Sequence, residues 1–366
     1  MPASWLRANC PCASCVDPVS GQRLAVITDL PEETEVTAAE PDGDAVLVTF
    51  GPDGHQGSFG RAWLARAGQP RPAPRTENAK RLWTAADFRA GPPEGRWPRY
   101  LADDGDRSRC LSAVLRGGFV LLRDVPATPG SVLAVAQSMG FVRETNYGRL
   151  FDIRAIVDPD NLAYSALAIA PHTDNPYRDP VPTVQLLHCL AGAAAGGDSG
   201  LVDGFGAAAR LRAEQPAAFD VLTSTPVTFG YSDATAELTA TAPMISLDAR
   251  GLITQIRFNS RSLRPLAVAD ATGPGPLSGP VGADAFYQAY RAFAAVLSRP
   301  GLMLTFRLGP GDCVVFDNTR ILHARTAFTA AGSRHLQGCY ADLDGIESTV
   351  AVLRRRASAG EQEQPS

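Results

Sequence analysis

The most informative feature of this sequence is a histidine and an aspartate two residues apart, followed far downstream by a second histidine. His172 and Asp174 stand in the stretch 171–178, and an apolar run follows at 183–190. Two histidines and one carboxylate make the facial triad that holds non-haem Fe(II) and leaves coordination positions open. His323 is the candidate for the second histidine, provided that its element folds back beside the first pair. The separation between 172 and 323 is wide enough for most of a β-barrel.

The remaining charged and histidine residues near this triad fall into two groups. Arg334 follows soon after His323, and a guanidinium there can hold the distal carboxylate of a dicarboxylate cosubstrate through a bidentate fork. His188, inside an apolar strand, and His335, beside Arg334, are interpreted as structural or as supporting residues behind the ligands.

Length and composition exclude several classes of protein. At 366 residues the chain can bury a sizeable core and is expected to hold more than one domain. Its hydrophobic content of 45% and charged content of 20% are ordinary for a soluble globular protein. The net charge of −4 gives no basic surface for nucleic acid, and no apolar run is long enough for a membrane span. The N-terminus lacks the apolar core of a signal peptide, so a cytoplasmic location is predicted.

Three of the seven cysteines lie within six residues of one another near the N-terminus. An odd number of cysteines, clustered in this way, argues against a secreted disulfide framework and for a metal site. Cys10, Cys12 and Cys15 can point at one ion, and thiolates suit zinc. His55, the only histidine before 172, is the candidate fourth ligand of a closed structural site. The alternative is that the thiols are buried and free, with His55 on a surface turn.

The chain divides into four parts in this interpretation. Residues 1–72 form a small zinc-binding β domain, whose short strands lie within 22–65. The Pro-rich stretch 68–75 ends this domain, and 73–82 form the linker. Residues 83–356 form the catalytic domain, and the polar tail 357–366 is predicted to be disordered.

The catalytic domain is predicted to be mainly β with helical insertions. Strands spaced along the chain, with a few helices between them, fit a jelly-roll or cupin-like barrel, a distorted double-stranded β-helix. The predicted strands are 118–122, 183–190, 252–258, 302–308 and 313–316. The predicted helices are 131–139, 206–223 with an interruption at Pro216, and 284–297, and 265–281 is predicted to be a loop.

The chain resembles the γ-butyrobetaine hydroxylases, which are Fe(II)/2-oxoglutarate dioxygenases related to trimethyllysine hydroxylase and, more distantly, to taurine dioxygenase. The resemblance covers roughly residues 4–355. In the N-terminal domain it rests on 5–15 (WLRANCPCASC) and 53–55 (DGH), and in the catalytic domain on 172–177 (HTDNPY), 185–189 (QLLHC), 196–199 (GGDS), 202–205 (VDGF), 316–318 (FDN), 322–323 (LH) and 333–342 (SRHLQGCYAD). It implies the same iron ligands and the same cosubstrate arginine as the spacing argument above.

The resemblance also implies an aromatic cage for a trimethylammonium group, since a quaternary cation is held by ring faces. The family pattern puts Tyr147, Phe151 and Tyr164 at cage positions and Tyr340 at the fourth, while Tyr177 is a further predicted substrate contact. Phe151 departs from the Trp of the animal enzymes. Because Phe has the weaker quadrupole, a weaker cage or a different head group is left open.

The acidic end of the substrate is the less determined part. Asn161 and Asn259 match the family's asparagines near a carboxylate, which amide N–H groups can hold. Extra guanidinium groups from Arg178, Arg257 or Arg261 would instead suit a phosphonate. A surface or interdomain ion pair is the favoured alternative for each arginine taken alone.

The predicted function is therefore hydroxylation by Fe(II), 2-oxoglutarate and O2, most simply of γ-butyrobetaine to L-carnitine, with release of succinate and CO2. A second candidate substrate is 2-trimethylaminoethylphosphonate or another betaine. A catalytically silent betaine-binding protein and a zinc-only adaptor are less favoured, because they leave the triad or the whole 172–334 set unexplained. The resemblance further implies a homodimer, and ascorbate as an aid to activity.

Overall fold

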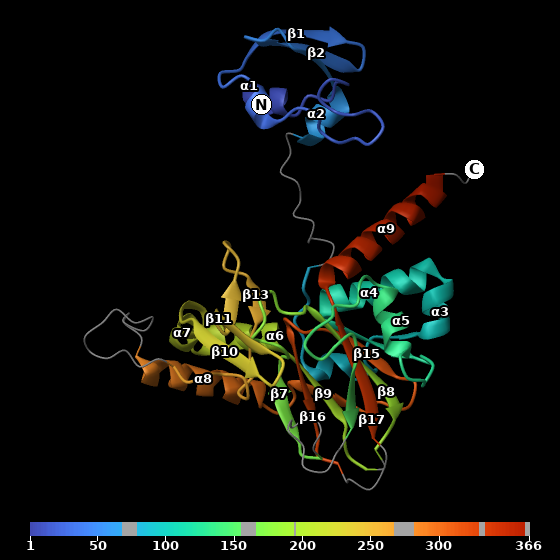
Figure 1. The fold of residues 1–366 in the computed structure, drawn as a ribbon, viewed down its shortest axis with the longest axis vertical. Helices are drawn as coiled ribbons and strands as arrows, with labels where there is room; N and C mark the ends of the chain where they lie inside the picture. Colours follow the sequence, from blue (N-terminus) through green and yellow to red (C-terminus); the bar gives the residue numbers. More distant parts are fainter. Residues whose placement is uncertain (68–78, 155–165, 194, 267–281, 329–333, 363–366) are drawn as a thin grey trace. The chain divides into compact units, whose positions relative to one another are not determined.

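The computed structural model describes residues 1–67, 79–154, 166–193, 195–266, 282–328 and 334–362 (Figure 1). The chain forms two compact units, Met1–Glu77 and Asn78–Ser366. Most of the predicted linker, and nearly all of the predicted loop 265–281, fall outside the described residues. None of the helices within the described ranges is both long enough and apolar enough to cross a membrane.

The first unit is built on a three-stranded antiparallel sheet in the order β1-β2-β3. Val48 and Phe50 of the middle strand and Phe59 of the third strand are buried in its small core together with Cys10 and Cys15. The cysteines are therefore part of the core itself. The strands are β1 (Glu35–Asp42), β2 (Ala45–Gly51) and β3 (Gln56–Gly60).

Two short helices in this unit were not predicted. Helices α1 (Ala3–Ala8) and α2 (Arg61–Ala67) contact each other through Trp5 and Trp63, whose ring centroids lie 5.6 Å apart. Helices of six and seven residues are too short to show a periodic apolar pattern. A single turn of 3₁₀ helix, η1 (Ile27–Asp29), precedes the sheet.

The second unit is built around two larger sheets that pack on each other. The larger has the order β4-β5-β15-β8-β17-β6 and the smaller β14-β9-β16-β7. Phe119 and Phe316 of the larger sheet pack in one cluster with Leu201 and Ile321 of the smaller sheet, so an apolar layer separates the two. This architecture of facing sheets agrees with the predicted barrel-like domain. The strands are β4 (Glu94–Arg96), β5 (Phe119–Arg123), β6 (Phe151–Arg154), β7 (Ile169–His172), β8 (Val184–Ala191), β9 (Ser199–Asp203), β14 (Met303–Phe306), β15 (Cys313–Asp317), β16 (Ile321–Arg325) and β17 (His335–Ala341).

Helices cover the other face of the larger sheet (Figure 1). Leu111 and Val114 of α4 pack in the same cluster as Val135 of α5 and Val315 of β15. The prediction of a mainly β chain therefore needs correction, because this helical layer is far more extensive than an insertion. The helices are α3 (Trp97–Ala102), α4 (Asp104–Gly117), α5 (Ser131–Gln137) and α9 (Leu343–Gln362), and the short η2 (Ala85–Phe88) lies upstream of them.

The C-terminal helix corrects the predicted polar tail. Ile346, Val350 and Leu353 recur at helical spacing and are buried, so they fix the first turns of α9 against the domain. The helix then continues to Gln362, through residues 357–362 that the sequence assigned to a disordered tail. Good helix-forming residues such as Ala and Glu in that stretch allow the helix to propagate once it has started.

A third group of elements packs beside the smaller sheet. Phe286 and Phe293 of α8 are buried, and they join Phe219 of α7 and Leu211 of α6 in one cluster. Helices α6 and α7 meet at Pro216, as predicted from the interruption there. The elements are α6 (Gly204–Glu214), α7 (Pro216–Ser224), β10 (Val227–Ser232), β11 (Glu237–Ala242), β12 (Ile245–Leu247), β13 (Ile253–Ile256) and α8 (Ala283–Leu297).

Candidate active site

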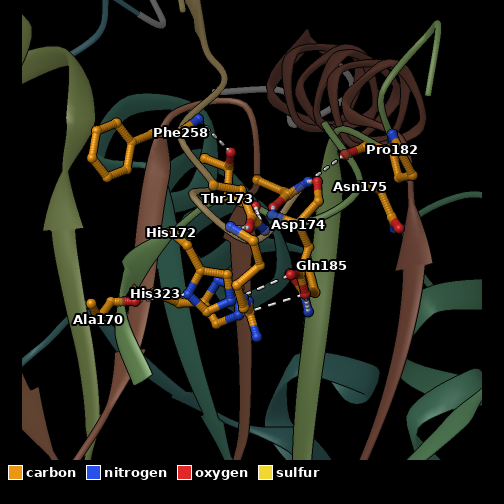
Figure 2. Close-up of polar contacts among 12 residues, drawn as sticks. Ala170, His172, Thr173, Asp174, Asn175, Pro182, Gln185, Phe258 and His323 are labelled. Atoms are coloured by element: carbon orange, nitrogen blue, oxygen red, sulfur yellow. Dashed lines mark hydrogen bonds and ion pairs between the residues drawn. The ribbon is translucent and has the colours of Figure 1, made fainter. Parts of the chain in front are cut away.

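The two histidines of the sequence motif are direct neighbours across two antiparallel strands. His172 ends β7, and His323 lies opposite it in β16, with ring centroids 4.1 Å apart. Asp174 follows β7 and approaches both rings: its carboxylate oxygens lie 3.4 Å from His172 Nε2 and 3.6 Å from His323 Nε2 (Figure 2). Ligand atoms of all three residues lie within 4.8 Å of one another. One ion can therefore contact all three.

Asp174 is held in place by buried amides. Asn318 Oδ1 accepts a hydrogen bond from Asp174 N at 2.8 Å, and Asn318 Nδ2 donates to Asp174 O at 2.9 Å and to Pro182 O at 3.0 Å. Gln185 Nε2 donates to the carboxylate at 2.8 Å (Figure 2). These contacts fix both the backbone and the carboxylate of Asp174, as expected around a metal ligand.

The protonation states suit metal binding. Burial opposes the charge of the Asp174 carboxylate, but His323 and His172 outweigh this effect and hold its pKa well below the usual range. Burial, with a contribution from His172, lowers the pKa of His323 to about 3, so its imidazole is neutral. His172 Nδ1 lies 2.9 Å from Ala170 O, so a proton on Nδ1 leaves Nε2 free to bind a metal. A carboxylate and neutral imidazoles are the forms that a metal requires.

The triad opens into a cavity of about 530 Å³. Aromatic rings line one part of it. The ring of Phe151 lies 5.9 Å from that of Tyr147 and 5.3 Å from that of Tyr340, measured between centroids. Gly338 makes room for Phe151, because a Cβ there would come within 2.5 Å of the Phe151 ring. Tyr177 also lines the cavity, and its hydroxyl lies 3.0 Å from that of Tyr147.

Three of the predicted cage residues are thus brought together, and the fourth is outside the described residues. Tyr164 and Asn161 both lie in 155–165, outside the described residues. The structure adds a ring that sequence reasoning missed, Tyr231 of β10, which also lines the cavity. No motif or spacing marks Tyr231 in the sequence, because its neighbours in space come from distant strands.

Arg334, directly before β17, lines the same cavity and is mostly buried. Burial lowers its pKa, and its guanidinium stacks over Phe328 at 5.3 Å. Within the described part of the chain, no carboxylate forms an ion pair with it. Arg325 lies two residues beyond His323 on β16 and lines the cavity as well. The cavity therefore offers a buried positive end that suits a carboxylate.

The other candidate arginines separate into two kinds. Arg178 donates to Asn146 Oδ1 at 2.6 Å, and Arg257 is buried, donates to Pro176 O and lies 3.8 Å from Asp179; neither lines the cavity. Arg261 lines the cavity, as does Arg264, which the sequence did not single out.

Asn259 lines the cavity, but part of its amide is already used. Its Nδ2 donates to Thr173 O at 2.9 Å, and its Oδ1 accepts from Arg261 N at 3.1 Å. One N–H of the amide remains for a ligand.

The two histidines interpreted as structural lie outside the cavity. His188 is fully buried in β8, and burial lowers its pKa. His335 lies 2.5 Å from Asp152 through Nε2. Side chains alternate along β8, so Gln185 and Leu187 face the cavity and His188 faces away.

The cysteine cluster of the first unit is a second candidate metal centre. His55 Nε2 lies 3.2 Å from the sulfur of Cys10, 3.5 Å from that of Cys12 and 3.6 Å from that of Cys15. Burial raises the pKa of the Cys12 thiol, but hydrogen bonds with Ser14 and the neighbouring thiols outweigh this and bring it to about 6. Three sulfur atoms and one imidazole nitrogen within reach of one point match a closed tetrahedral zinc site.

Comparison with known proteins gives matches along nearly the whole chain. Residues 1–65 match the model for the γ-butyrobetaine hydroxylase-like N-terminal domain, and residues 84–340 match the model for the taurine catabolism dioxygenase TauD, TfdA family. The γ-butyrobetaine dioxygenase of Pseudomonas sp. (strain AK-1) is 37% identical over 96% of this chain and 90% of its own length. The human γ-butyrobetaine dioxygenase is 31% identical over 98% of this chain and 92% of its own length.

A more distant relative and a solved structure extend these matches. The trimethyllysine dioxygenase of Meyerozyma guilliermondii is 28% identical over 95% of this chain and 89% of its own length. A solved asparagine oxygenase in complex with Fe(II), a hydroxyasparagine and succinate superposes with a TM-score of 0.50 at 18% identity, covering 67% of this chain and 82% of its own. That likeness concerns the fold alone.

Proposed function

The chain belongs to the γ-butyrobetaine hydroxylase group of the TauD, TfdA dioxygenase family, and from this membership we propose that it hydroxylates γ-butyrobetaine to L-carnitine. The observation that carries the proposal is the position of the triad. His172, Asp174 and His323 meet in a cavity that has aromatic rings on one side and the guanidinium of Arg334, which has no carboxylate partner among the described residues, on another. The aromatic rings suit the cationic head of a betaine substrate, and the guanidinium suits a carboxylate of 2-oxoglutarate.

The residues present fit the group that the family implies. Two imidazoles and a carboxylate suit Fe(II), and they come from one side so that other positions stay open. When bound, Fe(II) with 2-oxoglutarate and O2 supplies the oxidation that converts C–H into C–OH, with succinate and CO2 as the other products. His172, Asp174 and His323 would hold the ion, and Arg334 would hold the distal carboxylate of 2-oxoglutarate.

The protein's own contribution is orientation. The rings of Tyr147, Phe151 and Tyr340 would hold the trimethylammonium head by their faces, because it has no N–H to donate. The acidic end would be held by Asn259 through its remaining N–H, and by Asn161 as the family pattern implies. Two fixed ends select which carbon is presented to the metal, and this positioning supports the reaction.

A second candidate substrate is 2-trimethylaminoethylphosphonate, and the observation that favours it is the pair Arg261 and Arg264 in the cavity. Within the described residues, neither guanidinium has a carboxylate partner. A doubly charged phosphonate would gain more from them than a carboxylate does. Arg178 and Arg257, which the sequence also suggested for this role, do not line the cavity.

The test is to load the enzyme anaerobically with Fe(II), add 2-oxoglutarate and oxygen, and follow succinate with each of the two substrates. Carnitine and succinate in equal amounts from γ-butyrobetaine support the leading proposal. Turnover of the phosphonate alone would assign the binding of the substrate's anionic group to Arg261 and Arg264. Absence of substrate-dependent succinate favours a silent binding protein. Asp174→Ala is the control variant, and hydroxylation that survives this change would reject the iron ligands.

For the first unit we propose a structural zinc ion held by Cys10, Cys12, Cys15 and His55. The support is the donor set and its spacing, together with the burial of Cys10 and Cys15 in the small core. Four protein ligands leave no open position for chemistry. Zinc content by elemental analysis of the purified chain tests this, with Cys12→Ser as the variant that loses the ion. A homodimer, a cytoplasmic location and an effect of ascorbate stay predictions.

A further inference from the structure

We propose that the β10–β11 hairpin completes the cation site, with Tyr231 as an additional wall and Asp233 as the group that strengthens it. The inference rests on the proposed function and identifies a residue that sets substrate specificity. Neither residue belongs to a sequence motif, and they lie on an element separate from those that carry the other rings.

Tyr231 is placed against the other rings of the cavity. Its ring centroid lies 5.1 Å from that of Tyr177 at an interplanar angle of 25°, and 5.8 Å from that of Tyr147 at 65°. The first arrangement is stacked and the second is edge-on, so the three rings form a corner. Because Tyr147 also contacts Phe151, the corner continues the aromatic wall around the cavity. A spherical trimethylammonium head gains from each ring face that it meets.

The hydroxyl group of Tyr231 points at a fixed carboxylate. It donates to Asp233 Oδ2 at 2.5 Å. Asp233 Oδ1 accepts from Thr235 N at 2.7 Å, Thr235 Oγ1 at 2.9 Å and Ala236 N at 2.7 Å. These contacts hold the carboxylate still at the turn of the hairpin, and they hold the pKa of Asp233 at about 2, so it is ionised.

This pairing makes Tyr231 a better ring for a cation. A phenol that donates to a carboxylate carries more electron density in its ring, which increases the negative potential on the ring face. Burial and the hydrogen bond to Asp233 raise the pKa of Tyr231, so the proton stays on the phenol. The hairpin therefore favours a cation over a neutral group of the same shape.

The experiment measures this preference directly. Equilibrium binding to the anaerobic Fe(II)- and 2-oxoglutarate-loaded enzyme is compared for γ-butyrobetaine and for 5,5-dimethylhexanoate, in which carbon replaces the charged nitrogen. Tyr231→Leu should reduce the ratio of the two affinities by about tenfold, which corresponds to about 1.4 kcal/mol. Tyr231→Phe and Asp233→Asn keep the ring, and each should reduce the ratio about threefold, within the range expected of a single cation–π contact.

The controls separate this role from a structural one. Tyr287→Leu, an exposed tyrosine of α8 outside the cavity, should leave the ratio unchanged. The affinity for 2-oxoglutarate should stay the same in all variants. If Tyr231→Leu weakens both ligands equally, or neither, the inference is overturned. If Asp233→Asn matches the wild type, the role of Asp233 is rejected. A wild-type enzyme without any preference for the cation would reject the trimethylammonium substrate and the role of Tyr231 together.

Discussion

Asn318 offers the sharpest test of how the site is built. Its side chain makes three hydrogen bonds in a fully buried position: one from Asp174 N, one to Asp174 O and one to Pro182 O. Replacing it by Ala removes all three and leaves one N–H and two carbonyl groups without these partners. At about 0.5–1.5 kcal/mol for each hydrogen bond, the free energy of unfolding should fall by roughly 2–4 kcal/mol.

The same substitution should weaken metal binding, because Asp174 loses the contacts that fix its backbone. Loss of a residue that supports a ligand typically reduces metal affinity by about 10–100-fold. Urea unfolding of the metal-free protein measures the first effect, and anaerobic titration with Mn(II), followed by electron paramagnetic resonance, measures the second.

Ser138→Ala is the matched control for Asn318→Ala. Its hydroxyl bonds to Val135 O at 2.6 Å and to Tyr100 at 3.0 Å, away from the cavity. This variant should lose stability and keep its affinity for Mn(II). A loss of less than about 1 kcal/mol in Asn318→Ala, below the cost of a single orphaned buried group, would refute the hydrogen-bond reasoning. An Mn(II) affinity within threefold of the wild type would refute the link between Asn318 and the metal.

The remaining predictions concern the cosubstrate, pH, a buried ion pair and zinc. Arg334→Met should raise the dissociation constant for 2-oxoglutarate by about 100-fold and Arg334→Lys by less, since only a guanidinium makes the bidentate fork; isothermal titration checks this. The pKa of His323 is about 3 in the folded protein, against an ordinary value of about 6.5, so between pH 3 and 6.5 the unfolded state binds more protons than the folded state. The free energy of unfolding of the metal-free protein should therefore fall as the pH is lowered through this range. His323→Gln should make this dependence on pH less steep, as urea unfolding at several pH values measures. Arg320→Met, which leaves a buried carboxylate unpaired, should cost about 3–5 kcal/mol, whereas Arg299→Met in an exposed pair should cost less than about 1 kcal/mol; equal losses in thermal unfolding would contradict this. If the proposed zinc ion is present in the first unit, its removal by a chelator should unfold that unit and leave 2-oxoglutarate binding intact, as circular dichroism and titration can establish.

The sequence alone predicted the elements whose signal is local. The apolar run at 183–190 became β8, and the break at Pro216 separates α6 from α7. Helix α4 was missed because its first half, 104–109, has no large apolar residue, so its buried residues form a stripe only in the second half. The buried residues are Cys110, Leu111, Ser112, Val114 and Leu115. Such a stripe is weak evidence for a helix unless the sheet that it covers is known.

Some residues of the candidate site could likewise be predicted from the sequence, and others could not. Residue type and order were enough to group His172, Asp174 and His323, because few arrangements other than a metal site use this combination. Which arginines reach the cavity depends on strand register and on the packing of side chains, so Arg257 was considered and Arg264 was not. Tyr231 could not be predicted for the same reason, because it contacts Tyr147 and Tyr177 only through the position of β10 in the fold.

The register between β7 and β16 has a thermodynamic consequence. Among the described strands, β7 lies at the edge of its sheet, where it pairs only with β16, and His172 faces His323 across that single boundary. An ion bound by both histidines would join β7 to β16, so local unfolding of β7 would require release of the ion. Metal binding and local unfolding of this edge strand would therefore be thermodynamically coupled. The concentration of free iron would then set the fraction of molecules in which β7 is paired with β16. Hydrogen exchange of the β7 amides would report metal occupancy in the absence of turnover.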